Sequence, residues 1–223
     1  MTKILGTLII LCLPLLIMLG SVSLLATDQY LAYEYGKTGF PPDSFGFTDQ
    51  QRFILASTNI HYVYAHLPND ELSKQTLNGV PVYNPREVSH MADVQAVFQS
   101  VSRVWQAAFA LFLLLGFVLW RNGERIALAS AIRSGGIVTS GLVLSIALLA
   151  LFSWQAWFDL FHRLLFKEGS WLFDYSDTLI RLFPLKFWSD ATFTITAFSL
   201  VGGLLMALIG WRWQIVLEKK LGT

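Results

Sequence analysis

Four long runs of apolar residues divide this chain. Each run is long enough to cross the hydrocarbon core of a bilayer, which takes about 20 helical residues at about 1.5 Å per residue. Charged residues stand only near the ends of these runs. The pattern predicts four transmembrane helices, at about residues 4–26, 101–120, 137–157 and 191–211.

Two long connections, residues 27–100 and 158–190, separate the runs and mix polar residues with periodic apolar ones. Thr48 is placed to cap a helix that runs to about His66. Asn78-Gly79 is a turn signal before a short strand at 80–83. The apolar side of the helix is expected to hold Phe53, Ile54, Ile60 and Val63. We therefore expect the two connections to build a small folded cap.

The stretch from Asn84 to Asp93 predicts a helix that begins in water and continues into the second apolar run. Asn84 can cap it, Pro85 suits its first position, and Glu87 falls at its third. Apolar residues then recur at steps of three and four, which predicts one packed face. This stripe consists of Val88, Met91, Val94 or Gln95, Phe98, Val101 and Trp105.

The adjacent face of this helix carries the first candidate chemistry. It places His90 between Arg86, one turn earlier, and Asp93, one turn later. We expect the Asp93 carboxylate to accept a hydrogen bond from one ring nitrogen of His90, which would fix the tautomer and raise the basicity of the imidazole.

The third apolar run supplies a matching element. It is predicted to continue beyond the membrane as a helix through Asp159 and His162 and to end at Gly169. Two spans would then each carry a histidine with a carboxylate at helical spacing.

The two histidines would differ in height if both spans were straight. Counted along the helices, His90 lies about ten residues above the membrane core and His162 about five. We therefore expect the helix of His90 to tilt or to bend near Ser100 and Ser102.

Composition and charge distribution assign a class and an orientation. The chain has 223 residues, of which 54% are hydrophobic and 14% charged, as in membrane proteins. Basic residues gather at the N-terminus, in the 121–136 connection and in the tail, whereas acidic residues outnumber basic ones in both long connections. Positive residues mark the cytoplasmic side. We predict an all-α membrane protein that forms one membrane domain over 1–223, with both termini cytoplasmic and the cap outside.

The first apolar run follows Lys3 as a signal peptide would, but it is too long and Leu24 with Ala26 makes a poor cleavage site. We expect an uncleaved anchor. Cys12, the only cysteine, is expected to pack within this span because Leu11 before it is too large for a lipid-attachment box. One cysteine allows no intramolecular disulfide.

Aromatic residues mark two further segments. The tyrosines at 30, 33 and 35 follow the first span and suit either an interfacial belt or a pocket. A short amphipathic helix after Asp177, stopped by Pro184 and followed by Phe187 and Trp188, is predicted to lie in the interface. The last span holds three glycines with an expected packing role, Gly202, Gly203 and Gly210.

The chain has no phosphate-binding glycine loop, CxxC pair, HExxH motif, dinucleotide fingerprint or nucleophilic serine elbow. Acyl transfer would then need a nucleophile from the substrate. One imidazole could take a proton from an attacking amine or water, and the other could give one to a leaving alkoxide. Two alternatives remain open: a metal site of two histidines and two carboxylates, and a non-catalytic structural or partner-binding membrane subunit.

Three strings carry a resemblance to a known family: residues 86–94, Phe161-His162 with Phe166 and Trp171, and residues 177–184 followed by Phe187-Trp188. They resemble the bacterial lipoprotein intramolecular transacylases, which are four-span membrane proteins of about this length. The resemblance implies transfer of the sn-2 acyl chain of an S-diacylglyceryl cysteine to the α-amine of the same cysteine, which yields a lyso-form lipoprotein. It also implies that His90 and His162 are catalytic.

The resemblance extends to supporting residues and to partners. Arg86, Glu87 and Asp93 match the family pattern, and together with Asp159 we expect them to support or orient the histidines. Substrate contacts are expected from Tyr33, Trp171 and Arg181. No cofactor or metal is expected. The expected partners are a diacylated lipoprotein N-terminus and membrane lipid, without nucleic acid, in a bacterial cell membrane with the active site at the outer leaflet.

Overall fold

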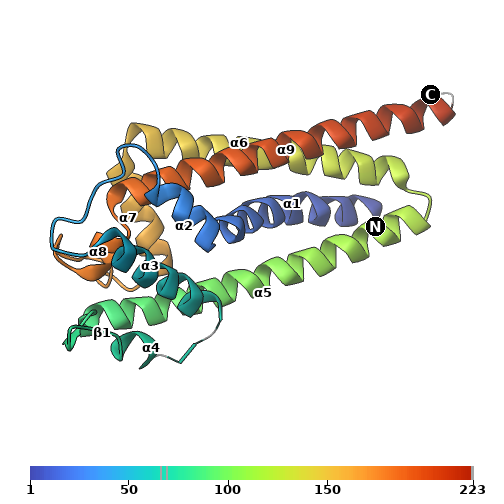
Figure 1. The fold of residues 1–223 in the computed structure, drawn as a ribbon. Helices are drawn as coiled ribbons and strands as arrows, with labels where there is room; N and C mark the ends of the chain where they lie inside the picture. Colours follow the sequence, from blue (N-terminus) through green and yellow to red (C-terminus); the bar gives the residue numbers. More distant parts are fainter. Residues whose placement is uncertain (66, 69, 222–223) are drawn as a thin grey trace. The chain divides into compact units, whose positions relative to one another are not determined.

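The computed structural model describes residues 1–65, 67–68 and 70–221, and its regular structure is mostly helical (Figure 1). The chain divides into two compact units. The membrane unit comprises Met1–Val22, Ser102–Phe152 and Phe193–Thr223, and the cap unit comprises Ser23–Val101 and Ser153–Thr192. The elements in chain order are α1 (Thr2–Leu25), α2 (Asp28–Tyr35), α3 (Asp49–Tyr64), α4 (Asp70–Ser73), β1 (Thr76–Leu77), β2 (Val80–Pro81), α5 (Pro85–Arg121), α6 (Arg125–Phe152), α7 (Trp154–Leu165), α8 (Thr178–Leu182) and α9 (Leu185–Leu221).

The membrane unit is built from α1 and the apolar parts of α5, α6 and α9. Among the described residues, these four helices are the ones long and apolar enough to cross a membrane, which confirms the predicted span number. One apolar cluster joins the start of α1, the end of α5 and the start of α6, with the end of α9 packed against it. The start of α1 and the end of α9 therefore lie at the same end of this unit as the α5–α6 connection (Figure 1). The cluster consists of Ile9, Leu115, Leu119, Leu128 and Ala131, with Trp213 against it.

Small residues let the membrane helices approach closely. A side chain at Gly203 would collide with Ser140 of α6, one at Gly210 with the α6 backbone, and one at Gly202 with Ile17 of α1. The predicted packing role of these glycines is therefore confirmed.

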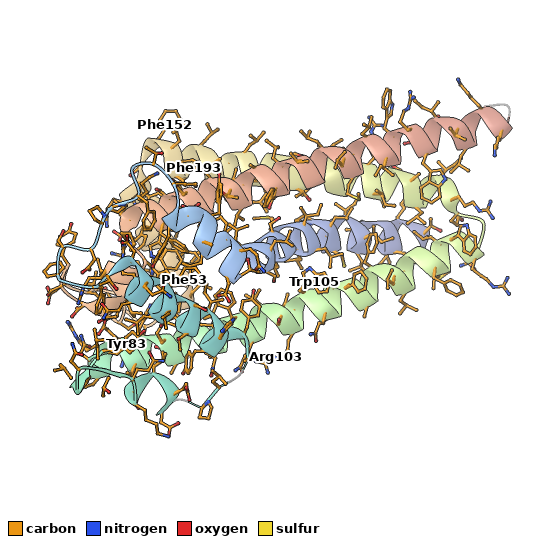
Figure 2. All side chains as sticks on the ribbon, viewed as in Figure 1. Phe53, Tyr83, Arg103, Trp105, Phe152 and Phe193 are labelled. Atoms are coloured by element: carbon orange, nitrogen blue, oxygen red, sulfur yellow. The ribbon has the colours of Figure 1, made fainter. Side chains whose placement is uncertain are left out.

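Two polar contacts tie α1 to its neighbours inside the membrane unit. The indole N–H of Trp105 on α5 donates to the carbonyl oxygen of Leu16 at 3.0 Å, and Figure 2 shows this side chain directed toward α1. Ser199 of α9 donates to Ser21 at 3.1 Å, and both serines are buried. Each contact satisfies a polar group that would be costly to leave unpaired in an apolar interior.

The cap unit has its own apolar core, formed by α2, α3, α4, α8 and the first turns of α5 and α9. The predicted α5 stripe is confirmed, since Met91 is buried in this core and Val88, Val94 and Phe98 pack against it. Thr48 caps α3 as predicted, in a capping box with Gln51. The core consists of Leu31, Ala56, Tyr62, Val63, Leu72, Tyr83, Met91, Leu179, Leu182 and Phe187.

The start of α5 is fixed by a reciprocal cap. The Asn84 side chain accepts from the Glu87 amide at 3.0 Å, and the Glu87 carboxylate accepts from the Asn84 amide at 2.8 Å. Glu87 is 1% exposed and also accepts from the amide of Leu179 at 2.7 Å. It therefore holds the start of α8 against the first turn of α5.

The path after the third span differs from the prediction. The α6 helix ends at Phe152, and Ser153 has a non-helical conformation (φ −152°, ψ 85°) and starts the separate helix α7. The Ser153 hydroxyl accepts from the amide of Ala156, which makes it the N-cap of α7. His162 thus lies on its own 12-residue helix, and the height difference counted along a continuous span does not apply.

Several smaller predictions were also wrong. Helix α7 ends at Leu165, and Gly169 (φ 79°) lies in the turn after it. Ile54 is 52% exposed, outside the core. The α2 helix was not predicted, and α9 begins at Leu185, so Phe187 and Trp188 belong to its first turn.

The predicted turn and the predicted short helix are both present. Asn78 (φ 52°) and Gly79 (φ 79°) form the expected hairpin turn, although the strand after it covers only Val80–Pro81. The short helix after Asp177 is present as α8. The prediction for His66 falls outside the described residues.

Candidate active site

Both histidines singled out by the sequence belong to the cap unit. His90 lies on the second turn of α5 and is half-buried against two aromatic rings. Its ring centre is 5.0 Å from that of Phe166 and 5.4 Å from that of Phe173. Its Nδ1 atom is buried and has no hydrogen-bond partner among the described residues.

The surroundings of His90 favour its neutral form. The pKa of His90 is lowered to about 4, mainly by burial and in addition by the positive charge of a protonated His162, while the charge of Asp93 opposes both effects. His90 precedes the apolar 101–120 stretch of α5, so it is outside the membrane-spanning segment. At neutral pH this imidazole is uncharged, and any proton placed on it is held weakly.

His162 is oriented by its own helix. Its Nδ1 lies 2.8 Å from the carbonyl oxygen of Phe158, one turn earlier in α7. A carbonyl oxygen only accepts hydrogen bonds, so Nδ1 carries the proton and, in the neutral ring, Nε2 presents a lone pair. Burial lowers the pKa of His162, whereas the Phe158 carbonyl and the Asp159 charge raise it. His162 is therefore the better proton acceptor of the two histidines.

Phe166 and the segment 171–173 bring the two histidines together. The Phe166 ring contacts both imidazoles, since its centre is also 5.7 Å from that of His162. Trp171 lies 5.5 Å from the His162 ring, and Phe173, two residues later, contacts His90. The result is a pair of imidazoles in an aromatic enclosure, coupled closely enough that charging His162 disfavours charge on His90.

The two carboxylates expected to orient the histidines do not hydrogen-bond to them. Asp159 accepts from the side chain of Gln155 at 2.9 Å, and the backbone of Phe158 takes the orienting role on His162. Asp93 is exposed and acts on His90 only through its charge. The hydrogen bond expected between His90 and Asp93 is therefore not formed, and in the described structure both carboxylates act on the histidines through their charge.

Arg86 lies beside the aromatic enclosure. Its guanidinium is 6.0 Å from the Phe173 ring centre and pairs with Asp177 at 3.4 Å and Asp174 at 3.9 Å. The arginine side chain is 63% exposed. These contacts place a salt-bridged cation next to the residue that packs on His90.

Two residues expected to contact substrate have other neighbours. Tyr33 is 62% exposed and lies beside Tyr30 and under the Lys37 ammonium. Arg181 pairs with the buried Asp43 carboxylate at 2.8 and 3.0 Å. No contact in the described structure joins either residue to the histidines.

Two further interactions in the cap unit are structural. Burial would raise the pKa of Asp43, but hydrogen bonds from Arg181 and from the amides of Phe47 and Phe45 lower it to about 2. The Tyr35 hydroxyl donates to the carbonyl oxygen of Leu182 at 2.6 Å. Tyr35 therefore joins α2 to α8 instead of lining a belt.

The histidines and their neighbouring carboxylates do not converge on one point. Among the described residues there is no group of three or more His, Cys, Asp or Glu side chains that could hold a metal ion. The metal-centre alternative therefore lacks a ligand set in the part of the chain that the structure describes.

The fold and the site together define an integral membrane protein with four spans and a helical cap unit in which two neutral imidazoles share an aromatic enclosure. A family model described as lipoprotein intramolecular transacylase Lit matches residues 7–188. The chain belongs to this family, and its role is that of an acyltransferase of the membrane.

Solved structures share this fold, and a sequence relative matches most of the chain. The membrane-integral lipoprotein intramolecular transacylase of Bacillus cereus has the same fold, with a TM-score of 0.78 and 19% identity over 100% of this chain and 99% of that one. A structure of the same protein with one histidine replaced by alanine gives a TM-score of 0.71 at 19% identity, covering 100% and 96%. An uncharacterized protein of Aquifex aeolicus is 30% identical over 218 residues, or 94% of each chain.

Sequence reasoning missed the residues that assemble the site. The Phe158 carbonyl carries no sequence signal, because any residue one turn before His162 would offer the same oxygen. Phe173 looked like one aromatic among many, and nothing local indicated that it would contact a histidine about 80 positions earlier. The aromatic residues near His162 were the one available clue.

Proposed function

We propose that this chain moves the sn-2 acyl group of an S-diacylglyceryl cysteine, at the N-terminus of a lipoprotein, to the α-amine of the same cysteine. The observation that carries the proposal is the pairing of His162, whose Nε2 is left free to accept a proton, with a weakly basic His90 on the same Phe166 ring. Family membership supports the reaction class.

The reaction balances without an outside reactant. The α-amine nitrogen attacks the sn-2 ester carbon, a C–N bond forms, and the bond from that carbon to the glyceryl oxygen breaks. One proton leaves the nitrogen and one reaches the glyceryl oxygen, so the products are an amide and a free sn-2 hydroxyl. Both reacting groups belong to one molecule, and such proximity can be worth an effective concentration of about 10⁵–10⁸ M.

We propose roles for the two histidines from their unequal environments. His162 takes the amine proton, because its imidazolium is stabilised by the Phe158 carbonyl and the Asp159 charge. The proton then passes from His162 to His90, whose imidazolium is destabilised by burial and by charge on His162, and His90 gives it to the departing glyceryl oxygen, so both histidines end the cycle neutral. A free α-amine titrates near 7.7–8.0, so a fraction is unprotonated at neutral pH before the base acts. General acid–base help of this kind contributes about 10²–10⁴-fold.

The proposal includes a location. Basic residues flank the spans on the side of both termini, and the long connections carry the acidic excess, which supports cytoplasmic termini and a cap unit outside the cell membrane. The active site would then face the outer leaflet, where the diacylglyceryl group of a lipoprotein is anchored.

Expression in a bacterium that lacks its own lipoprotein N-acylating enzymes tests this function. Mass spectrometry of a lipoprotein N-terminal peptide should show the lyso form, in which the amine is acylated and one glyceryl hydroxyl is free. The His61→Ala variant is the matched control for alanine variants of His90 and His162, because His61 is an exposed histidine of the same unit, paired with Asp28 on α2. An unchanged diacylglyceryl peptide with the wild-type chain would contradict the proposal.

A further inference from the structure

The acid–base pair leaves one demand of the reaction unmet. When the amine adds to the ester carbon, negative charge develops on the carbonyl oxygen, and a donor must stabilise it without losing its own proton. Neither histidine suits this task, since each is engaged in moving a proton. Arg86 is already paired with Asp177 and Asp174.

Trp171 carries an N–H donor on a ring that packs beside His162. Its side chain is 7% exposed, and its ring centre is 5.5 Å from that of His162. Its indole N–H is buried and has no hydrogen-bond acceptor among the described residues. A buried indole N–H normally finds a partner, and leaving one unpaired costs about 1–3 kcal/mol. An unpaired donor beside a catalytic base is therefore a feature that needs a cause.

The chemistry of indole limits the roles that Trp171 can have. An indole N–H only donates, and it does not ionise in the physiological range, so Trp171 cannot serve as a general acid or base. It can hold a fixed dipole toward an oxygen that gains charge. A preorganised donor of this kind needs no reorganisation as the charge forms.

We infer that the indole N–H of Trp171 binds the sn-2 ester carbonyl oxygen and stabilises its negative charge in the tetrahedral adduct. This inference rests on the proposed transacylase function and adds a third catalytic residue to it. In the adduct, the former carbonyl oxygen accepts a hydrogen bond from Trp171, His162 holds the proton taken from nitrogen, and the N–H bond of Trp171 stays intact throughout.

A turn with a glycine precedes Trp171. Gly169 has a φ of 79°, a conformation that glycine adopts without strain, and it lies in the turn between α7 and Trp171, whose ring packs beside that of His162. Trp154, at the start of α7, supplies a comparison. Its Nε1 is also buried without a partner, but its ring contacts Phe158 and no described contact joins it to either histidine.

The test compares Trp171→Phe with Trp154→Phe in the purified full-length chain. The substrate is a synthetic S-diacylglyceryl cysteinyl peptide, and the product is followed by mass spectrometry. We expect Trp171→Phe to lower kcat by about 10²–10³-fold with KM nearly unchanged, which is the effect of losing one oxyanion donor. Trp154→Phe is expected to keep kcat within about threefold of wild type, because it removes an equally buried N–H away from the base.

A third variant distinguishes the effect of losing the N–H group from the effect of changing the shape of the ring. Replacing Trp171 with 3-benzothienylalanine keeps the bicyclic shape and exchanges N–H for sulfur. The same loss of kcat supports the inference, whereas wild-type kcat overturns it and assigns Trp171 to packing. Equal losses in Trp171→Phe and Trp154→Phe, or a lower thermal unfolding midpoint that accounts for the loss, also overturn it. If the wild-type chain itself fails to convert the peptide, the proposed function fails; if wild type and Trp171→Phe turn over equally, only this inference fails.

Discussion

The Nδ1 of His162 donates to the carbonyl oxygen of Phe158 at 2.8 Å, within one turn of the same helix. Orientation of the His162 imidazole therefore depends on the helical state of α7 and not on a second side chain. The Ser153 N-cap that starts α7, nine residues before His162, thus helps to position the proposed base.

One consequence concerns Asp159. Because this carboxylate bonds to Gln155 and acts on His162 only through its charge, Asp159→Asn should lower kcat by less than about fivefold, the scale of one partly exposed charge pair. Steady-state kinetics with a diacylated lipopeptide checks this. A loss above 100-fold would mean that the carboxylate, and not the Phe158 carbonyl, holds the imidazole.

The ionisation of His90 can be measured directly. Its pKa is lowered to about 4, mainly by burial, so its imidazole resonances should not titrate between pH 8 and pH 5.5. NMR of histidine-labelled protein, with the signal identified by its loss in His90→Ala, gives the midpoint. A midpoint at or above 6.5 would contradict the assignment of His90 as the weaker base.

Removing the Phe166 ring should raise the pKa of His90. Since this ring covers both imidazoles, Phe166→Ala should let water reach His90 and raise its pKa toward the ordinary value of 6.5. The same labelled sample measures the shift. Phe161→Ala is the matched control, because Phe161 contacts His162, and no described contact joins it to His90. An unchanged midpoint in Phe166→Ala would show that other groups keep His90 buried.

The sequence predicted the spans well and the assembly of the site only in part. Apolar runs are local signals, so four helices could be read from them, and helix capping placed the starts of α3 and α5. The break at Ser153 was missed because apolar and aromatic residues continue through it, and the side-chain pattern gives no sign of a non-helical serine. The pairing of Arg181 with Asp43 joins residues 138 positions apart, which no local pattern predicts.

The Arg181–Asp43 pair should contribute to stability and not to substrate binding. The pKa of Asp43 is lowered from 3.8 to about 2 in the folded state, so its stabilising effect is full above pH 4 and is lost as the pH falls from about 4 to about 2. Asp43→Asn should cost about 2 kcal/mol at pH 7. The free energy of unfolding of Asp43→Asn, measured in detergent, should be lower than that of wild type at pH 7, and the difference should be smaller at pH 3.

The kinetics of Arg181→Lys distinguish a stabilising role of Arg181 from a role in substrate binding. The lysine keeps a charge near Asp43 but loses the two-point contact, so stability should fall while KM for the lipopeptide stays within about twofold. A KM raised tenfold in folded protein would instead place Arg181 on the substrate.

Chelation tests the metal-centre alternative. The Nδ1 of His162 is engaged with a carbonyl, and the described residues offer no three-ligand group, so activity should survive dialysis against EDTA unchanged. Activity that is lost to EDTA and restored by zinc would favour a metal-dependent reaction over the two-histidine one.

The most direct test of the central claim is a crossover experiment with purified protein. Two diacylated lipopeptides of different sequence are mixed, one of which carries a deuterated sn-2 acyl chain, and the products are weighed. Intramolecular transfer predicts that deuterium appears only on the amine of its own peptide and that both His90→Ala and His162→Ala lower the rate by at least about 10²-fold. Deuterium on the other peptide, its release as free fatty acid, or normal turnover by either folded histidine variant would contradict the account.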